Sequence, residues 1–152
     1  MKIEVKNLKI AQFASEETLC YEATVYVDGK KAFFASNQGR GGPDFYRPID
    51  KALMNAAMEY VKTLPAIKTE WGSTLDMNME LFIGELLDEK QLEKEVKKIL
   101  KKTAYLIGTE LWTMKNPYDE RIKAYIMKKH PDAIILNELP AQKVMELVKG
   151  KI

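Results

Sequence analysis

The fold is decided by residues 21–64, YEATVYVDGKKAFFASNQGRGGPDFYRPIDKALMNAAMEYVKTL. The first seven alternate apolar and polar side chains, which is the period of a half-buried strand. Asp28-Gly29 follows at the spacing of a two-residue hairpin, because glycine tolerates the positive φ that such a turn requires. Ala32–Ala35 is then the returning strand. Apolar side chains at spacings of three and four predict a helix over residues 48–64, with Pro48 in its first turn.

Working outward toward the N-terminus, residues 3–13 predict a further strand. Its apolar side chains at Ile3, Val5, Leu8 and Ile10 change register near Asn7. A polar turn over residues 15–18 leads into the next strand. The expected result is an antiparallel three-stranded meander with one apolar face, which the 48–64 helix covers until Pro65 stops it.

Toward the C-terminus, a loop over residues 65–75 precedes two predicted helices. The first covers 77–87 with Asp76 as its N-cap. The second begins at Asp88, because Asp88 and Gln91 form a variant of the capping-box pattern. Its exposed side is dense with glutamate and lysine.

The last third of the chain mixes short apolar runs with helical patterns. Residues 103–114 predict one bulged strand or a short hairpin interrupted at Gly108. Asn116-Pro117 predicts the start of a helix that ends near His130, residues 133–136 read as a short strand or helix, and Pro140 opens a final helix. We therefore predict a single α+β domain over residues 1–152: a three-stranded meander packed by a helix, then a mainly helical half with one or two short strands. A soft sub-boundary is expected near 65–73.

The amino-acid composition excludes several classes of protein. The chain has 152 residues, 46% of them hydrophobic and 30% charged, with a formal net charge of +2, which is typical of a globular protein and too small to announce a nucleic-acid or membrane partner. A single cysteine, Cys20, allows no internal disulfide. No secretory signal and no apolar run of membrane-spanning length is present, so a cytoplasmic location without membrane contact is expected.

One glycine cluster stands out, in residues 36–47, SNQGRGGPDFYR. Glycines leave backbone N–H groups accessible, and such a nest holds anions, while arginine favours bidentate contact with phosphates or carboxylates. The pattern is neither a Walker A motif nor G-x-G-x-x-G. The alternative is that the stretch is a mobile connection between a strand and a helix, with Arg40 simply solvated. The predicted ligand- or partner-binding residues are Asn37, Gly39, Arg40, Gly41, Gly42, Tyr46 and Arg47.

A second candidate surface is the lysine-rich helix near residues 94–102. Its lysines could contact nucleic-acid phosphates, together with Arg40 and Arg47. The acidic segment before it could equally neutralise it, leaving an ordinary solvated face. The lysines concerned are Lys94, Lys97, Lys98, Lys101 and Lys102.

Residues for catalysis are scarce. His130 is the only histidine and ends a predicted helix, where a cation is favoured by the helix dipole. Cys20 lies within a predicted strand, where a small hydrophobe is expected. The pairs Asp76/Glu80 and Glu85/Glu89 are typical of solvated helix faces. We therefore predict no catalytic residue, no metal and no cofactor, and an enzyme is the less favoured reading.

Two resemblances accompany these patterns. Residues 21–64, with KALMNAA at 51–57, are similar to the C-terminal part of double-stranded-RNA-binding domains, although Lys51 stands where that family has a lysine cluster and a strand precedes in place of its leading helix. FASEET at 13–18, VDG at 27–29, SNQGRGGP at 36–43 and LNELP at 136–140 resemble a group of small bacterial and phage proteins. That second resemblance implies a mobile-element or bacterial setting and no particular activity.

The sequence thus favours a non-catalytic binding protein, plausibly a phage-encoded inhibitor or adaptor, that contacts a host protein or an anionic ligand through residues 36–47. One alternative is a nucleic-acid-binding protein that uses the lysine-rich helix. Another is an enzyme or sensor that holds a nucleotide at the glycine cluster.

Overall fold

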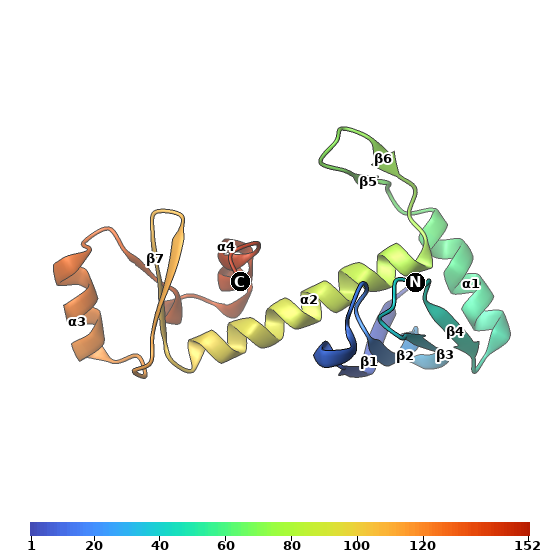
Figure 1. Cartoon of the computed structure of the whole chain (residues 1–152), viewed down its shortest axis with the longest axis horizontal. Coiled ribbons are helices and arrows are strands. Elements are labelled where there is room, and N and C mark those ends of the chain that lie inside the picture. Colours follow the sequence, from blue (N-terminus) through green and yellow to red (C-terminus); the bar gives the residue numbers. More distant parts are fainter. The chain divides into compact units, whose positions relative to one another are not determined.

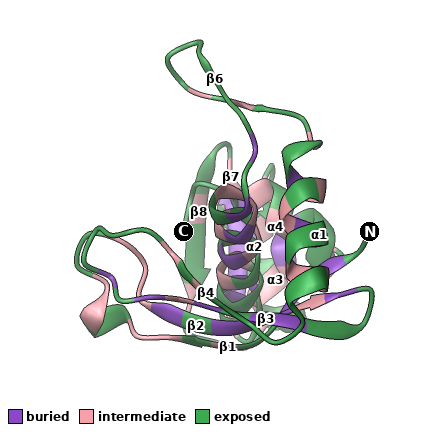
Figure 2. Ribbon diagram, turned by 90° about the vertical axis from the view of Figure 1, so that its right-hand side faces the viewer, coloured by how far each residue is buried: buried purple, intermediate pink, exposed green.

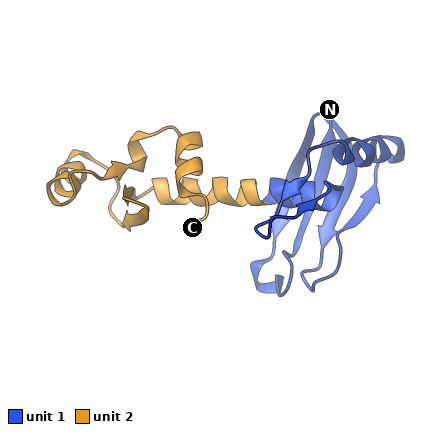
Figure 3. Ribbon diagram, turned by 90° about the horizontal axis from the view of Figure 1, so that it is seen from above, with its two compact units in different colours: residues 1–87 blue, residues 88–152 orange.

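A computed structural model describes all residues, 1–152 (Figure 1). Contacts divide the chain into two compact units, residues 1–87 and 88–152 (Figure 3). The divide falls within helix α2, Met79–Leu100, rather than in the loop at 65–73. The predicted α+β class is confirmed, since antiparallel sheets and helices build the chain.

The first unit is built on a four-stranded antiparallel sheet in the order β1-β2-β3-β4. The strands are β1 Ile3–Ile10, β2 Tyr21–Val27, β3 Lys30–Asn37 and β4 Phe45–Pro48. The predicted break at Asn7 is confirmed, because the register shifts between Lys6 and Lys9 and Asn7 has a φ of 54°. The fourth strand was not predicted, and it turns the three-stranded meander into a four-stranded one.

One face of this sheet carries the core of the first unit. Buried side chains of the strands pack against Ala57 and Val61 of helix α1, Lys51–Lys62, and against Met79, Ile83 and Leu87 of α2 (Figure 2). Helix α1 begins at Lys51 and not at Pro48. The reason is that Pro48 still pairs with Phe33 in the sheet, and the Asp50 carboxylate caps the helix by accepting from the Leu53 N–H at 3.0 Å.

A small hairpin joins α1 to α2. Its strands are β5 Ile67–Lys68 and β6 Thr74–Leu75, and Figures 1 and 2 show it extending away from the rest of the first unit. Trp71 lies in its turn and is 90% exposed.

Helix α2 corrects two sequence predictions. It is one continuous helix rather than two, because Asp88 lies in its middle, where the backbone N–H groups already have helical partners. Its N-terminus is capped by Asn78 and not by Asp76, since the Asn78 side chain accepts from the Leu81 N–H at 2.9 Å.

The second unit contains a three-stranded antiparallel sheet in the order β8-β7-β9, with β7 Thr103–Ile107, β8 Glu110–Met114 and β9 Ile134–Ile135. Of the two predicted alternatives for residues 103–114, one bulged strand or a short hairpin, the structure has the hairpin. One face packs on the C-terminal part of α2 and on α4, Ala141–Val148, and the other on α3, Glu120–Lys129. Short 3-10 turns at Gln12–Ala14 and Leu136–Glu138 complete the elements.

Helix α3 begins later than predicted. The Asp119 carboxylate accepts from the Ile122 N–H at 2.9 Å and so caps the helix. Asn116 instead offers its carbonyl oxygen to the Thr103 hydroxyl at 2.8 Å, which ties it to the sheet.

Candidate functional site

The glycine cluster lies in a different place from the one predicted. It connects two antiparallel strands, β3 and β4, rather than a strand and a helix. Residues 38–44 form the connection, whereas Asn37 ends β3 and Phe45, Tyr46 and Arg47 belong to β4. The predicted site residues are therefore divided between a loop and the two strands that it connects.

The Asn37 side chain is the centre of this connection. Asn37 is only 9% exposed. Its Oδ1 accepts from the Thr18 hydroxyl at 2.7 Å and from the Gly39 N–H at 2.8 Å. Its Nδ2 donates to the Gly42 carbonyl at 3.0 Å and to Asp44 Oδ1 at 3.1 Å. The four hydrogen bonds made by this one side-chain amide fix the shape of the loop. Asn37 is therefore a structural residue and not a freely accessible binding residue.

Gly39 is held against the neighbouring loop at 11–20. Its carbonyl oxygen accepts from three successive N–H groups, those of residues 16, 17 and 18. A Cβ added at Gly39 would lie 2.2 Å from the Ala14 carbonyl oxygen, and its φ is +83°. Only glycine satisfies both conditions, so this position is explained by packing within the protein.

The surroundings of Gly41 disfavour an anion. A Cβ at Gly41 would lie 2.2 Å from a carboxylate oxygen of Glu17. The Gly41 N–H is directed at the Thr18 hydroxyl at 3.4 Å, and the Gly39 N–H is already used by Asn37. The predicted anion nest thus has two of its N–H groups engaged and a negative charge beside it.

Asp44 joins the loop to the core face of the sheet. Its Oδ2 accepts from the Tyr21 hydroxyl at 2.8 Å and from the Tyr46 hydroxyl at 3.1 Å. Burial raises the pKa of both phenols, and the Asp44 carboxylate raises it further. The Tyr46 ring packs edge-on against Phe33 at 5.4 Å between centroids. Tyr46 is therefore directed toward the core and away from the surface on which a partner would sit.

The two arginines remain free of ion pairs. Arg40 and Arg47 are both exposed, and neither forms a salt bridge. Arg47 points out of the opposite face of the sheet, where its guanidinium carbon lies 4.7 Å from the centroid of the Phe34 ring. Gly42 is exposed with open space around it.

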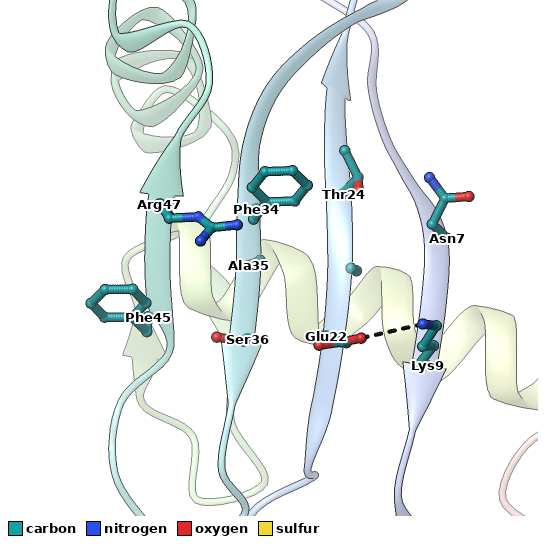
Figure 4. Close-up of a pocket in the computed structure, with 10 residues that line it drawn as sticks. Asn7, Lys9, Glu22, Thr24, Phe34, Ala35, Ser36, Phe45 and Arg47 are labelled. Atoms are coloured by element: carbon teal, nitrogen blue, oxygen red, sulfur yellow. Dashed lines mark ion pairs between the residues drawn. The ribbon is translucent and has the colours of Figure 1, made fainter.

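That opposite face, which we call the outer face, carries a shallow depression of about 480 Å³ over all four strands (Figure 4). No core cluster covers it, since both packing helices lie on the other side of the sheet. The side chains that come forward in Figure 4 include Lys9, Glu22, Phe34, Ser36, Phe45 and Arg47.

Aromatic rings and cations alternate across the outer face. Phe45 is 67% exposed and Phe34 is 38% exposed. The Lys6 ammonium lies 4.6 Å from the Tyr26 ring centroid, a cation–π arrangement like that of Arg47 over Phe34. Lys9 pairs with Glu22 at 3.6 Å, whereas Lys6 and Arg47 have no carboxylate partner.

The predicted lysine surface is formed by the last turns of α2 and the residues after it. Lys94, Lys97 and Lys98 lie on the helix and are exposed, Lys101 is exposed just beyond it, and Lys102 is half-buried. Only Lys97 forms an ion pair, with Glu93 at 3.7 Å. The structure therefore brings Lys94, Lys97 and Lys98 to one exposed element.

The remaining candidate residues do not come together with other reactive side chains in a catalytic or metal-binding cluster. Cys20 is a half-buried free thiol, and Ser15 accepts a hydrogen bond from its N–H at 2.8 Å. His130 ends α3 as expected, with its ring 6.4 Å from that of Trp112. No group of three or more His, Cys, Asp or Glu side chains has the geometry to hold a metal ion. No helix is long and apolar enough to cross a membrane.

Sequence reasoning missed Phe34, Tyr26 and Lys6 as residues of this surface. A signal was present, because Phe34 follows Phe33 and one of two adjacent strand residues must face away from the core. Comparison of the chain with protein-family models, curated proteins and solved structures finds no match. The two family resemblances therefore stay predictions.

Proposed function

We propose that this protein is a non-catalytic binding protein that contacts a partner protein through the outer face of its N-terminal sheet. The observation that carries the proposal is the Arg47 guanidinium stacked over Phe34, next to the exposed Phe45 ring, on a sheet face that no helix of the first unit covers. Two of the residues concerned, Phe45 and Arg47, come from the glycine-rich segment on which the sequence prediction centred.

The composition of the outer face favours a protein partner. Aromatic residues and arginine are enriched at the centres of protein interfaces, and a few of them supply most of the binding energy. An exposed phenylalanine is available to fill an apolar pocket, and an unpaired guanidinium to receive a carboxylate in bidentate geometry. The partner we expect therefore presents an acidic side chain beside an apolar recess.

A nucleic acid is the less suitable occupant of this face. Glu22 lines the depression, so a phosphate backbone would meet a carboxylate there. On this proposal the hydrogen-bonded loop at 38–44 serves as support, because it fixes the strand from which Phe45 and Arg47 project.

The proposal extends to the setting that the sequence suggests. If the chain is encoded by a phage, the partner is a host protein, the protein is an inhibitor or adaptor, and both act in the host cytoplasm. These points rest on the sequence resemblance and on the outer face together.

The test is site-directed photocross-linking. A photoreactive phenylalanine analogue placed at residue 45 should cross-link one defined protein in cells that make this chain. The purified partner should then bind Phe45→Ala and Arg47→Ala each at least tenfold more weakly, about 1.4 kcal/mol, than the unmodified chain.

Matched controls separate the outer face from general effects. Phe13→Ala removes a phenylalanine that is 94% exposed in the loop after β1, and Lys51→Ala removes an exposed cation at the start of α1. Both should leave the affinity unchanged. Cross-linking to nucleic acid instead of protein, or equal losses in the controls, would refute the proposal.

A further inference from the structure

The second unit carries an excess of positive charge that the total composition conceals. Residues 1–87 contain 10 lysine and arginine residues against 12 acidic ones, a net charge of −2. Residues 88–152 contain 14 against 10, a net charge of +4. The formal charge of +2 for the whole chain is therefore the sum of two unlike units.

Residues 88–100 of α2 contain four lysines and four acidic residues, so the net excess lies outside the helix, but the four lysines gather on one face of α2. At roughly 100° per residue, Lys90, Lys94, Lys97 and Lys98 all lie within about 60° of the direction of Lys94. All four are exposed, and Lys101 is exposed directly after the helix ends. We call these four helical residues the lysine face.

The other side of the helix is already occupied. Val96 and Ile99 are buried in the core formed with β7 and α4, and Leu92 packs against the same cluster. The lysine face is directed away from this core, so it is available to a ligand. Only Lys97 has a carboxylate partner, Glu93 at 3.7 Å, and both of those side chains are largely exposed.

The chemistry of the lysine face selects among polyanions. Lysine is depleted at protein interfaces, and this face carries no aromatic or arginine anchor. Membrane-surface helices insert an apolar face, but the apolar face of α2 is packed within the protein. Single-strand binders stack bases on aromatic rings, and the lysine face has none. Lysines that act as point charges suit the phosphate backbone of a duplex, which is read without base contacts.

We propose that the lysine face of α2 binds the phosphate backbone of double-stranded nucleic acid without sequence preference. The inference is independent of the protein-binding proposal, since it rests on different residues in a different unit. Together the two would make the protein an adaptor between a protein and a nucleic acid.

The test measures binding of the full chain to a labelled DNA duplex of arbitrary sequence between 50 and 200 mM salt. For a duplex, the logarithm of the affinity falls with the logarithm of salt by about 0.9 for each phosphate contact. A Lys94→Gln, Lys97→Gln, Lys98→Gln variant should therefore show a slope reduced by about 2 to 3. Glutamine has a helix propensity close to that of lysine, so α2 should persist.

The matched control is Lys115→Gln, Lys128→Gln, Lys149→Gln, which removes three exposed lysines from the same unit outside α2. This control should keep the slope of the unmodified chain, as should Phe45→Ala. The inference is overturned by an unchanged slope in the α2 variant, by an equal loss in the control, or by tighter binding to a single strand. Binding to anionic lipid vesicles in place of the duplex would overturn it as well.

Discussion

The Asn37 side-chain amide donates to the Asp44 carboxylate at 3.1 Å, and this contact closes the connection between β3 and β4. Asn37 ends one strand and Asp44 directly precedes the next. The pair therefore fixes the point at which β4 begins. It also fixes the direction in which Phe45 and Arg47 leave the sheet.

Asn37→Ala should destabilise the first unit by about 2 kcal/mol or more. The change leaves the Gly39 N–H without its acceptor and deprives Thr18 and Asp44 of a partner, and each unsatisfied buried group costs about 1–3 kcal/mol. Urea denaturation measures the effect. Gln38→Ala, at the exposed next position, should change stability by less than about 0.5 kcal/mol. Equal behaviour of the two variants would contradict the role given to Asn37.

Gly39→Ala and Gly42→Ala should differ sharply although they lie three residues apart. A Cβ at Gly39 would collide with a backbone carbonyl oxygen and occupy a φ of +83°, whereas Gly42 has open space and no positive φ. We expect a loss of more than about 1–2 kcal/mol for the first and less than about 0.5 kcal/mol for the second. Thermal unfolding of the two variants checks this, and similar midpoints would refute the packing explanation.

Gly84→Ala should stabilise the protein. Gly84 lies within α2 and a Cβ there meets nothing within 4 Å, so alanine would lower the entropy cost of the helix by roughly 0.5–1 kcal/mol. Gly108→Ala provides the contrast, because Gly108 has a φ of +60° in the β7–β8 turn and should lose stability. Differential scanning calorimetry compares them. A loss of stability in Gly84→Ala would mean that glycine is needed for a close approach.

The elements that sequence could predict are those governed by local pattern. The alternation of β2, the Asp28-Gly29 turn and the apolar stripe of α1 all depend on residues a few positions apart. Strand β4 was not predicted because its four residues have no apolar alternation of their own, and the strand forms through pairing with β3. The continuity of α2 could not be predicted for the opposite reason, because a local pattern indicated a helix start that the structure does not contain. Asp88 and Gln91 carry a local capping pattern that tertiary packing on both sides overrides.

The candidate site followed the same division. The exposure of Arg40, Arg47 and the α2 lysines could be foreseen from charge alone. The Gly39 carbonyl oxygen is bonded by the loop at 11–20, which joins residues about 20 positions apart in the sequence. The Tyr46 hydroxyl donates to Asp44, which directs the Tyr46 side chain toward the core. No local sequence pattern encodes either contact. The residues on the open face of a sheet can be assigned only once the residues of its covered face are known.

Stability should decline as pH rises above about 10, in part through Tyr21 and Tyr46. Their pKa values are raised in the folded state, by burial and by Asp44, above the value of about 10 in the unfolded chain. The unfolded state therefore loses these protons first, so their contribution is complete below pH 10 and is lost at higher pH. Free energies of unfolding between pH 8 and 11 measure the slope. Tyr21→Phe, Tyr46→Phe should flatten it, and an unchanged slope would contradict the assignment.

At acid pH the second unit should respond through Glu138. The Tyr118 hydroxyl donates to this carboxylate and Lys123 lies 2.9 Å from it, and both contacts lower the pKa of Glu138 below its usual value. A depressed folded pKa gives stability that is present above the unfolded pKa, about 4.3, and is lost as pH falls through the folded one. Glu138→Gln should therefore reduce the acid sensitivity of unfolding, followed by circular dichroism between pH 6 and 3. Glu146→Gln is the matched control, because Glu146 has only Lys143 at 3.9 Å, and it should leave the acid profile as it is. If both variants shift the profile alike, the hydrogen bonds to Glu138 have no special effect, and its exposed position outweighs them.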